Sequence, residues 1–137
     1  MESMRTARTP FASLAAAAFL LLGAGMAHAT ECVAVRVKPI RHICGVVYDP
    51  THEPIPNAKV TIIKDGHELS SVQSDGDGKF TFGQLDAANY VVRVQAQGFL
   101  TAEALVVVVR PTAKCKRGLE VVLELGLGCS SISRAKQ

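Results

Sequence analysis

From residue 30 onward, apolar and polar residues alternate one by one, and no other feature constrains the fold as strongly. The clearest case, NYVVRVQAQ, places Tyr90, Val92 and Val94 on one side and Arg93 on the other. This alternation is typical of a half-buried strand, because successive side chains of a strand point to opposite faces. Turn signals recur roughly every ten residues and no segment has a convincing helical period, so the sequence predicts an all-β sandwich or barrel.

The same pattern predicts seven strands and the interior that they share. The segment 67–74 is polar and is therefore expected near an edge of a sheet. The strands are expected at residues 42–48, 57–65, 67–74, 79–82, 89–97, 100–110 and 119–125, with an optional leading edge strand at 32–38. The residues expected in the core are Val47, Val60, Phe80, Phe82, Tyr90, Val92 and Val94.

Residues 1–29 have the parts of a secretory signal peptide. Arg5 and Arg8 precede an apolar run, and Ala27-His28-Ala29 is typical of a cleavage site. The apolar run is short for a membrane span, which needs roughly 20 residues, although an uncleaved anchor remains an alternative. We expect cleavage after Ala29 and a secreted or periplasmic chain without a transmembrane span. The predicted organisation is a signal peptide at 1–29, one β-sandwich domain at 30–129 and a polar tail at 130–137.

The charge of the chain is nearly balanced. It holds 15 Lys and Arg against 12 Asp and Glu, which does not favour a nucleic-acid partner. The basic cluster that the sequence does show is formed by Lys114, Lys116 and Arg117. We interpret this cluster as a solvated loop, because nucleic-acid sites need a broader basic patch.

The four cysteines, Cys32, Cys44, Cys115 and Cys129, predict two disulfides in a small exported domain. A zinc site is disfavoured, because no C-x-x-C pair is present. If strands 42–48 and 119–125 lie side by side and parallel, Cys44 and Cys115 are at the same end. A leading segment that folds back would then bring Cys32 close to Cys129. Four cysteines allow three pairings, and the other two remain open.

The stretch VQSDGDGKFTFG could be a metal loop or a β-turn. A calcium loop of the EF-hand type needs oxygen ligands at positions 1, 3, 5 and 12. Counting from Asp75, Asp77 is at position 3 but Lys79 is at position 5. The sequence therefore predicts a structural turn formed by Asp75, Asp77 and Gly78, with weak calcium binding as the alternative.

The residues that could catalyse a reaction have no supporting pattern. His42, His52 and His67 have no second ligand or carboxylate at a useful spacing, so we interpret them as exposed or turn residues. Ser70, Ser71 and Ser74 lack the G-x-S-x-G context of a hydrolase nucleophile. The sequence predicts no catalytic residue, no metal and no cofactor.

Two stretches, CGVVYDPTHEPIPNAKVTI and QSDGDGKFTFGQLDAANYVVRVQAQGF, together resemble the carboxypeptidase regulatory-like domain. The resemblance spans about residues 43 to 125. It implies a seven-stranded Greek-key prealbumin-like (transthyretin-like) β-sandwich. The residues that carry it are Gly45, Val47, Asp49, Pro54, Pro56, Ala58, Val60, Asp75, Gly78, Phe80, Phe82, Leu85, Tyr90, Val92, Val94, Gly98 and Phe99.

Two enzyme types share this kind of sandwich, and their signatures are not matched. A hydroxyisourate hydrolase would end in a Tyr-Arg-Gly-Ser-type tail, whereas this chain ends in SISRAKQ. An intradiol dioxygenase would use two tyrosines and two histidines on ferric iron. Here the two tyrosines are Tyr48 and Tyr90, and Tyr90 is expected in the core.

The sequence therefore predicts a non-catalytic binding or structural module that acts through protein–protein contacts at its sheet edges. One alternative is a carbohydrate- or cell-envelope-binding protein, and another is a small enzyme on a transthyretin-like fold. The edge segments 32–38 and 67–74 could also pair two copies into a homodimer, because exposed strand edges favour such pairing.

Overall fold

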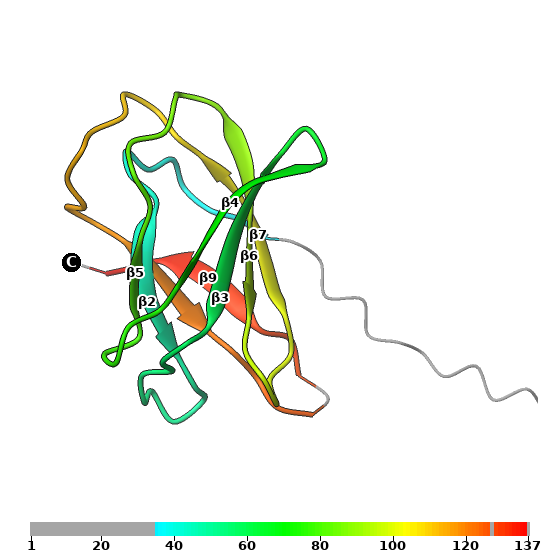
Figure 1. The fold of residues 1–137 in the computed structure, drawn as a ribbon. Helices are drawn as coiled ribbons and strands as arrows, with labels where there is room; N and C mark the ends of the chain where they lie inside the picture. The colour runs from blue at the N-terminus through cyan, green and yellow to red at the C-terminus, as the bar shows by residue number, and fades with distance from the viewer. Residues whose placement is uncertain (1–34, 127, 137) are drawn as a thin grey trace, which may run out of the picture.

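The computed structural model describes residues 35–126 and 128–136, so the predicted signal peptide and Cys32 lie outside the described residues. The described residues form nine β-strands, arranged in two sheets that face each other (Figure 1). Within these residues, no helix meets the length and hydropathy needed to cross a bilayer. The architecture is the predicted all-β sandwich, with two strands beyond the predicted seven.

The larger sheet contains five strands, and its pairing is antiparallel except at one edge. The exception is the outermost pair, in which Val35 lies opposite Ala104 in parallel register. The predicted leading edge strand is present here as a two-residue strand. In spatial order the strands are β1 (Val35–Arg36), β7 (Ala102–Val107), β6 (Asn89–Gln95), β3 (Lys59–Lys64) and β4 (His67–Gln73).

The smaller sheet contains four strands around a central parallel pair. β2 and β8 lie side by side and parallel, as the disulfide argument required, with Val47 opposite Val121. Gly45 permits this pairing, because a Cβ atom there would lie 2.2 Å from the carbonyl oxygen of Leu119. In spatial order the strands are β5 (Lys79–Thr81), β2 (Cys44–Tyr48), β8 (Leu119–Val122) and β9 (Ser131–Arg134).

The prediction of a polar tail at 130–137 was wrong for its central part. Residues Ser131–Arg134 form β9, which pairs antiparallel with β8. Ile132 lies opposite Val121 and is 3 % exposed, so it extends the core beneath the smaller sheet. Besides the pairing with β8 and the burial of Ile132, the hydroxyl of Ser130 donates to the carbonyl oxygen of Leu100 and accepts from the backbone N–H of Glu124, so a segment of polar composition is ordered.

The core lies between the two sheets and is built from the residues that alternate inward. Val60 lies opposite Val94 and Ile62 opposite Val92, so the inward rows of β3 and β6 are in register. Val47, Val60, Phe80, Phe82, Tyr90, Val92 and Val94 are all buried.

Tyr90 has the polar group that needs a partner within this core. Its hydroxyl donates a hydrogen bond to the carbonyl oxygen of Asp86, at 2.8 Å. Burial, and secondarily the charge of Asp86, raise the pKa of Tyr90 above its ordinary value. Tyr90 is thus a neutral core residue, which is the role that the sequence predicted.

Candidate functional site

The Asp75–Gly78 segment is a turn in which the carboxylate binds its own loop. The Oδ1 atom of Asp75 accepts hydrogen bonds from the backbone N–H groups of Asp77 and Lys79, both at 2.9 Å. The backbone N–H of Gly78 donates to the carbonyl oxygen of Asp75 at 3.0 Å. Within the described part of the chain, no group of three or more metal-ligating side chains is close enough to hold a metal ion. The geometry is that of an Asx turn.

Asp49 stabilises the following loop in the same way. Its Oδ1 atom accepts hydrogen bonds from the backbone N–H and the hydroxyl of Thr51, at 2.8 and 2.7 Å, and from the backbone N–H of Glu53 at 2.9 Å. The hydrogen bond from Glu53 and then that from the Thr51 hydroxyl hold the pKa of Asp49 below its ordinary value. The ring of His52 in this loop stacks on that of Tyr48, the last residue of β2, with centroids 4.0 Å apart. These residues therefore order a loop.

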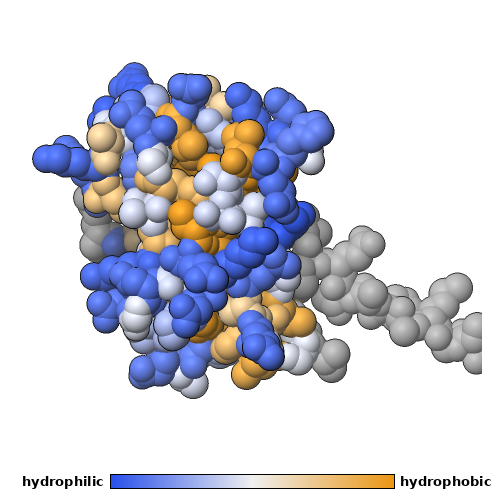
Figure 2. Space-filling model, viewed as in Figure 1, coloured by the Kyte–Doolittle hydropathy of each residue, from blue (hydrophilic) through white to orange (hydrophobic). Residues whose placement is uncertain are grey.

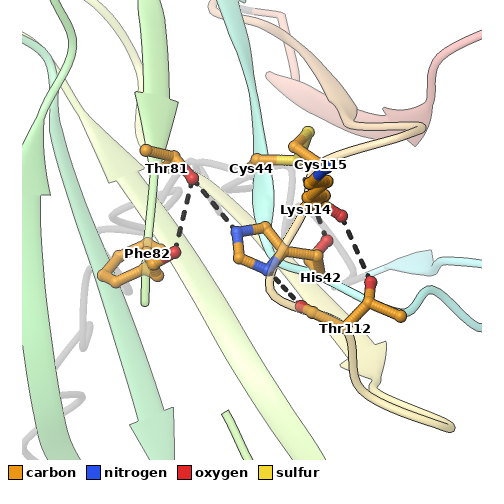
Figure 3. The surroundings of a disulfide bond; sticks show 7 residues. All are labelled: His42, Cys44, Thr81, Phe82, Thr112, Lys114 and Cys115. Atoms are coloured by element: carbon orange, nitrogen blue, oxygen red, sulfur yellow. Dashed lines mark hydrogen bonds between the residues drawn. A yellow bond between two sulfur atoms is a disulfide. The ribbon is translucent and has the colours of Figure 1, made fainter. Parts of the chain in front are cut away.

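His42 is buried, and the interpretation of all three histidines as exposed or turn residues was wrong for this one. Its ring is held on both sides (Figure 3): Nδ1 lies 2.8 Å from the carbonyl oxygen of Thr112, and Nε2 lies 3.1 Å from Oγ1 of Thr81. A carbonyl oxygen only accepts, so Nδ1 carries a proton and donates it. His42 thus ties the loop before β8 to the smaller sheet. His67 is exposed at the start of β4.

A disulfide joins Cys44 to Cys115 next to His42, with the two Cα atoms 6.1 Å apart (Figure 3). This pairing is the one predicted for these two cysteines, and it anchors the same loop to β2 a second time. Cys129 is also disulfide-bonded. Its predicted partner, Cys32, lies outside the described residues, so that pairing stays a prediction.

Beside this anchored loop, the structure gathers more positive charge than the sequence indicated. A hollow of about 50 Å³ is lined by Lys114, Lys116 and Arg117 of this loop and also by Arg41 and Arg134. No Asp or Glu is among its lining residues. The sequence pattern missed this grouping because the charges come from three separate segments. The predicted Cys44–Cys115 bond was the available signal, since it brings Arg41 to the basic loop.

A second candidate surface is the edge of the larger sheet at β4. All but one residue of β4 is exposed, and Leu69 keeps 53 % of its surface in solvent. The backbone N–H of Ser74 donates to the carbonyl oxygen of Ala58 at 2.9 Å. Hydrogen-bonded and non-hydrogen-bonded pairs alternate along an antiparallel ladder. Ser74 is hydrogen-bonded to β3, so Ser71, three residues earlier and opposite Thr61, belongs to a non-hydrogen-bonded pair, and its N–H points away from β3. Figure 2, drawn from the same side as Figure 1, shows apolar patches among polar residues on the side of the molecule that faces the viewer.

The family model described as "Carboxypeptidase regulatory-like domain" matches residues 42–124, more than half of the chain. The chain belongs to this family. The matched segment of the domain runs from His42 to just beyond β8, so β1 and β9 lie outside it. A search of curated proteins finds no match to this domain or to the rest of the chain.

Among solved structures, the domain is similar to the 5-hydroxyisourate hydrolase of Klebsiella pneumoniae. The TM-score is 0.54 at 17 % identity, and the match covers 69 % of this chain and 99 % of that one. This likeness shows a transthyretin-like fold. Two further similar structures are a 3-chlorocatechol 1,2-dioxygenase from Rhodococcus opacus (TM-score 0.39, 10 % identity, 73 % and 65 % covered) and a catechol 1,2-dioxygenase from Acinetobacter (0.37, 12 %, 77 % and 60 %).

Proposed function

We propose that the chain is a non-catalytic binding module that acts outside the cytoplasm and engages a protein partner along the exposed edge of β4. The observation that carries this proposal is the geometry of that edge. β4 ends the larger sheet, contains no proline, and offers an outward-pointing N–H at Ser71. An extended peptide can add to such an edge as a further strand, with main-chain hydrogen bonds supplying affinity.

The polar residues that an enzyme would use support the non-catalytic role, because they already perform structural tasks. His42 bridges a loop to the smaller sheet, and Asp75 closes a turn on its own backbone. Tyr90 is a core residue bonded to a backbone carbonyl. Recruiting any of these side chains for chemistry would break an interaction that holds the fold.

The Cys44–Cys115 disulfide supports a location outside the cytoplasm, because disulfides persist in oxidising compartments. The signal-peptide pattern at residues 1–29 points the same way. Fractionating the native cells, and measuring in which fraction the protein is found, tests this part of the proposal. Recovery in the cytoplasm with reduced Cys44 and Cys115 would contradict it.

The partner is expected to supply an extended segment with an apolar residue that covers Leu69. Leu69 is exposed, and Ile62 and Ile63 of β3 lie opposite its two neighbours, Ser70 and Glu68, so an irregularity in the pairing leaves Leu69 without an opposite residue. Such an irregularity re-aims the side chain at a strand edge. A side chain that points outward there gives a docking strand a defined register.

Ser71→Pro tests this mode of binding, because proline removes the outward N–H while the bonds to β3 stay. The matched control is Ser71→Ala, which keeps the N–H. Crosslinked partners recovered with the unchanged protein and with Ser71→Ala should be lost with Ser71→Pro. A mass measurement in solution would reveal whether the partner is a second copy of the chain. If Ser71→Pro retains the same partners while remaining folded, binding does not use the β4 edge.

A further inference from the structure

Five cations from three segments meet at one end of the sandwich, around the hollow of about 50 Å³. One precedes β2, three lie on the loop before β8, and one ends β9. No carboxylate is among the residues that line this hollow. The five are Arg41, Lys114, Lys116, Arg117 and Arg134.

Of these five, Arg134 is the residue with a buried side-chain nitrogen that lacks a partner within the described chain. Arg134 lies opposite Leu119, which is 1 % exposed, so it shares the inward side of the smaller sheet. Its Nε atom is buried and has no hydrogen-bond partner among the described residues. The ion pairs found in the described chain are those of Arg93 with Glu68 and Glu103, and none of these three residues lines the hollow. A partly buried guanidinium without a counter-charge is costly, which favours an anion beside it.

The hollow is held in shape before any ligand arrives. The His42–Thr112 hydrogen bond and the Cys44–Cys115 bond fix the loop that carries three of the cations. The Nε atom of Arg41 donates to the carbonyl oxygen of Arg110 at 3.0 Å, which orients its guanidinium. Such preorganisation lowers the entropy cost of binding, so a small ligand can be held by few contacts.

The structure assigns this hollow as a binding site for a phosphate group. Its small volume suits one tetrahedral oxyanion better than a sugar ring, and arginine forks match phosphate oxygens. A groove of about 470 Å³ between β1 and β9 shares Arg117 and Arg134 with the hollow. The groove adds the cations Arg36, Lys38 and Lys136 and the apolar side chain of Ile132. It can accommodate the remainder of a molecule that carries the phosphate.

This site is independent of the β4 edge, and it uses strands that lie outside the family match. The bound phosphate is either free inorganic phosphate or a phosphate carried by a lipid. Both sources present the same oxyanion to the hollow, and the groove is expected to distinguish them. The two are separated by using two probes.

The first probe is sodium phosphate, titrated at constant ionic strength into the purified protein while backbone NMR shifts are followed. We expect saturable shifts at residues around 41, 112–117 and 134. Arg134→Gln and Arg117→Gln should each raise the dissociation constant by about tenfold, the effect of losing one charged hydrogen bond. The control Lys59→Gln removes the same charge from an exposed side chain at the start of β3 and should leave the dissociation constant unchanged.

The second probe is vesicles of phosphatidylcholine with phosphatidylglycerol, tested by co-sedimentation. Binding that Arg117→Gln abolishes and Lys59→Gln retains would identify a lipid headgroup as the source. Binding of inorganic phosphate alone would identify the free ion. The assignment is overturned if neither probe binds saturably, or if Lys59→Gln weakens binding as much as the two arginine variants. Melting curves establish that each variant is folded, and only folded variants are compared.

Discussion

The Nδ1 atom of His42 lies 2.8 Å from the carbonyl oxygen of Thr112, 70 residues away in the sequence. This hydrogen bond and the nearby Cys44–Cys115 disulfide attach one long loop at two neighbouring points, just before β2 and at its first residue. The loop precedes β8, the parallel partner of β2. The loop leads from β7 of the larger sheet to β8 of the smaller one, and the two attachments reduce the freedom that such a connection keeps.

Replacing His42 with alanine is expected to destabilise the fold by about 2 to 4 kcal/mol, because the substitution removes a buried ring together with its two hydrogen bonds and opens a cavity. The free energy of unfolding in urea measures this. His67→Ala is the matched control, since His67 is exposed on β4, and it should change stability by less than about 0.5 kcal/mol. Equal stability of the two variants would show that the His42 bridge contributes nothing.

Removing the disulfide with the double variant Cys44→Ala/Cys115→Ala should cost about 4 kcal/mol. The two cysteines are 71 residues apart, and a crosslink over a long loop restricts the unfolded chain strongly. Urea unfolding of the double variant against the unchanged protein gives the value. Adding a reductant to the unchanged protein should lower its stability at least as far. A loss below about 1 kcal/mol would mean that the bond barely constrains the unfolded state.

Gly78→Ala should destabilise the domain by about 2 to 4 kcal/mol. Gly78 has a φ of 72°, and a Cβ atom there would lie 2.6 Å from the carbonyl oxygen of Val47. Gly76, in the same turn, has no atom within 4 Å of a built Cβ, and Gly76→Ala is therefore the control. Thermal or urea unfolding of both variants tests the pair. If both cost the same, the close approach to Val47 is not the cause.

The two-residue period was sufficient to predict the sheet faces and the core. Phe80 and Phe82 flank one exposed threonine, and both are buried, because a strand with one covered face leaves no other register. The turn formed by Asp75 and Gly78 was equally local, since an aspartate and a glycine carry their own turn geometry. Features of this kind depend on neighbours within a few residues, so one sequence reveals them.

The features that the sequence did not reveal depend on distant segments. Ile132 is a single apolar residue in a polar stretch, and its burial follows from the free edge of β8. His42 is buried because a loop 70 residues later closes over it. The hollow lined by Arg134 is formed by three separate segments of the chain. Local patterns carry no record of such contacts.

Asp49 is expected to make stability depend on acidic pH. Its carboxylate accepts three hydrogen bonds, which hold its pKa in the folded chain below the unfolded value of roughly 3.9. Its contribution is therefore complete above about pH 5 and is lost as the pH falls below about 4 through the folded pKa. Urea midpoints measured over this range should converge for the unchanged protein and Asp49→Asn at the acidic end.

Thr51→Ala separates the charge of Asp49 from its hydrogen bonds. This variant keeps the carboxylate and the backbone donors but removes the hydroxyl that donates at 2.7 Å. The pKa of Asp49 should then be depressed less in this variant. The free energy of unfolding of the variant should therefore fall less steeply with acid than that of the unchanged protein. If Thr51→Ala and the unchanged protein lose stability along the same curve, the hydroxyl does not stabilise the charged form. The depressed pKa of Asp49 would then rest on the backbone N–H groups of Thr51 and Glu53.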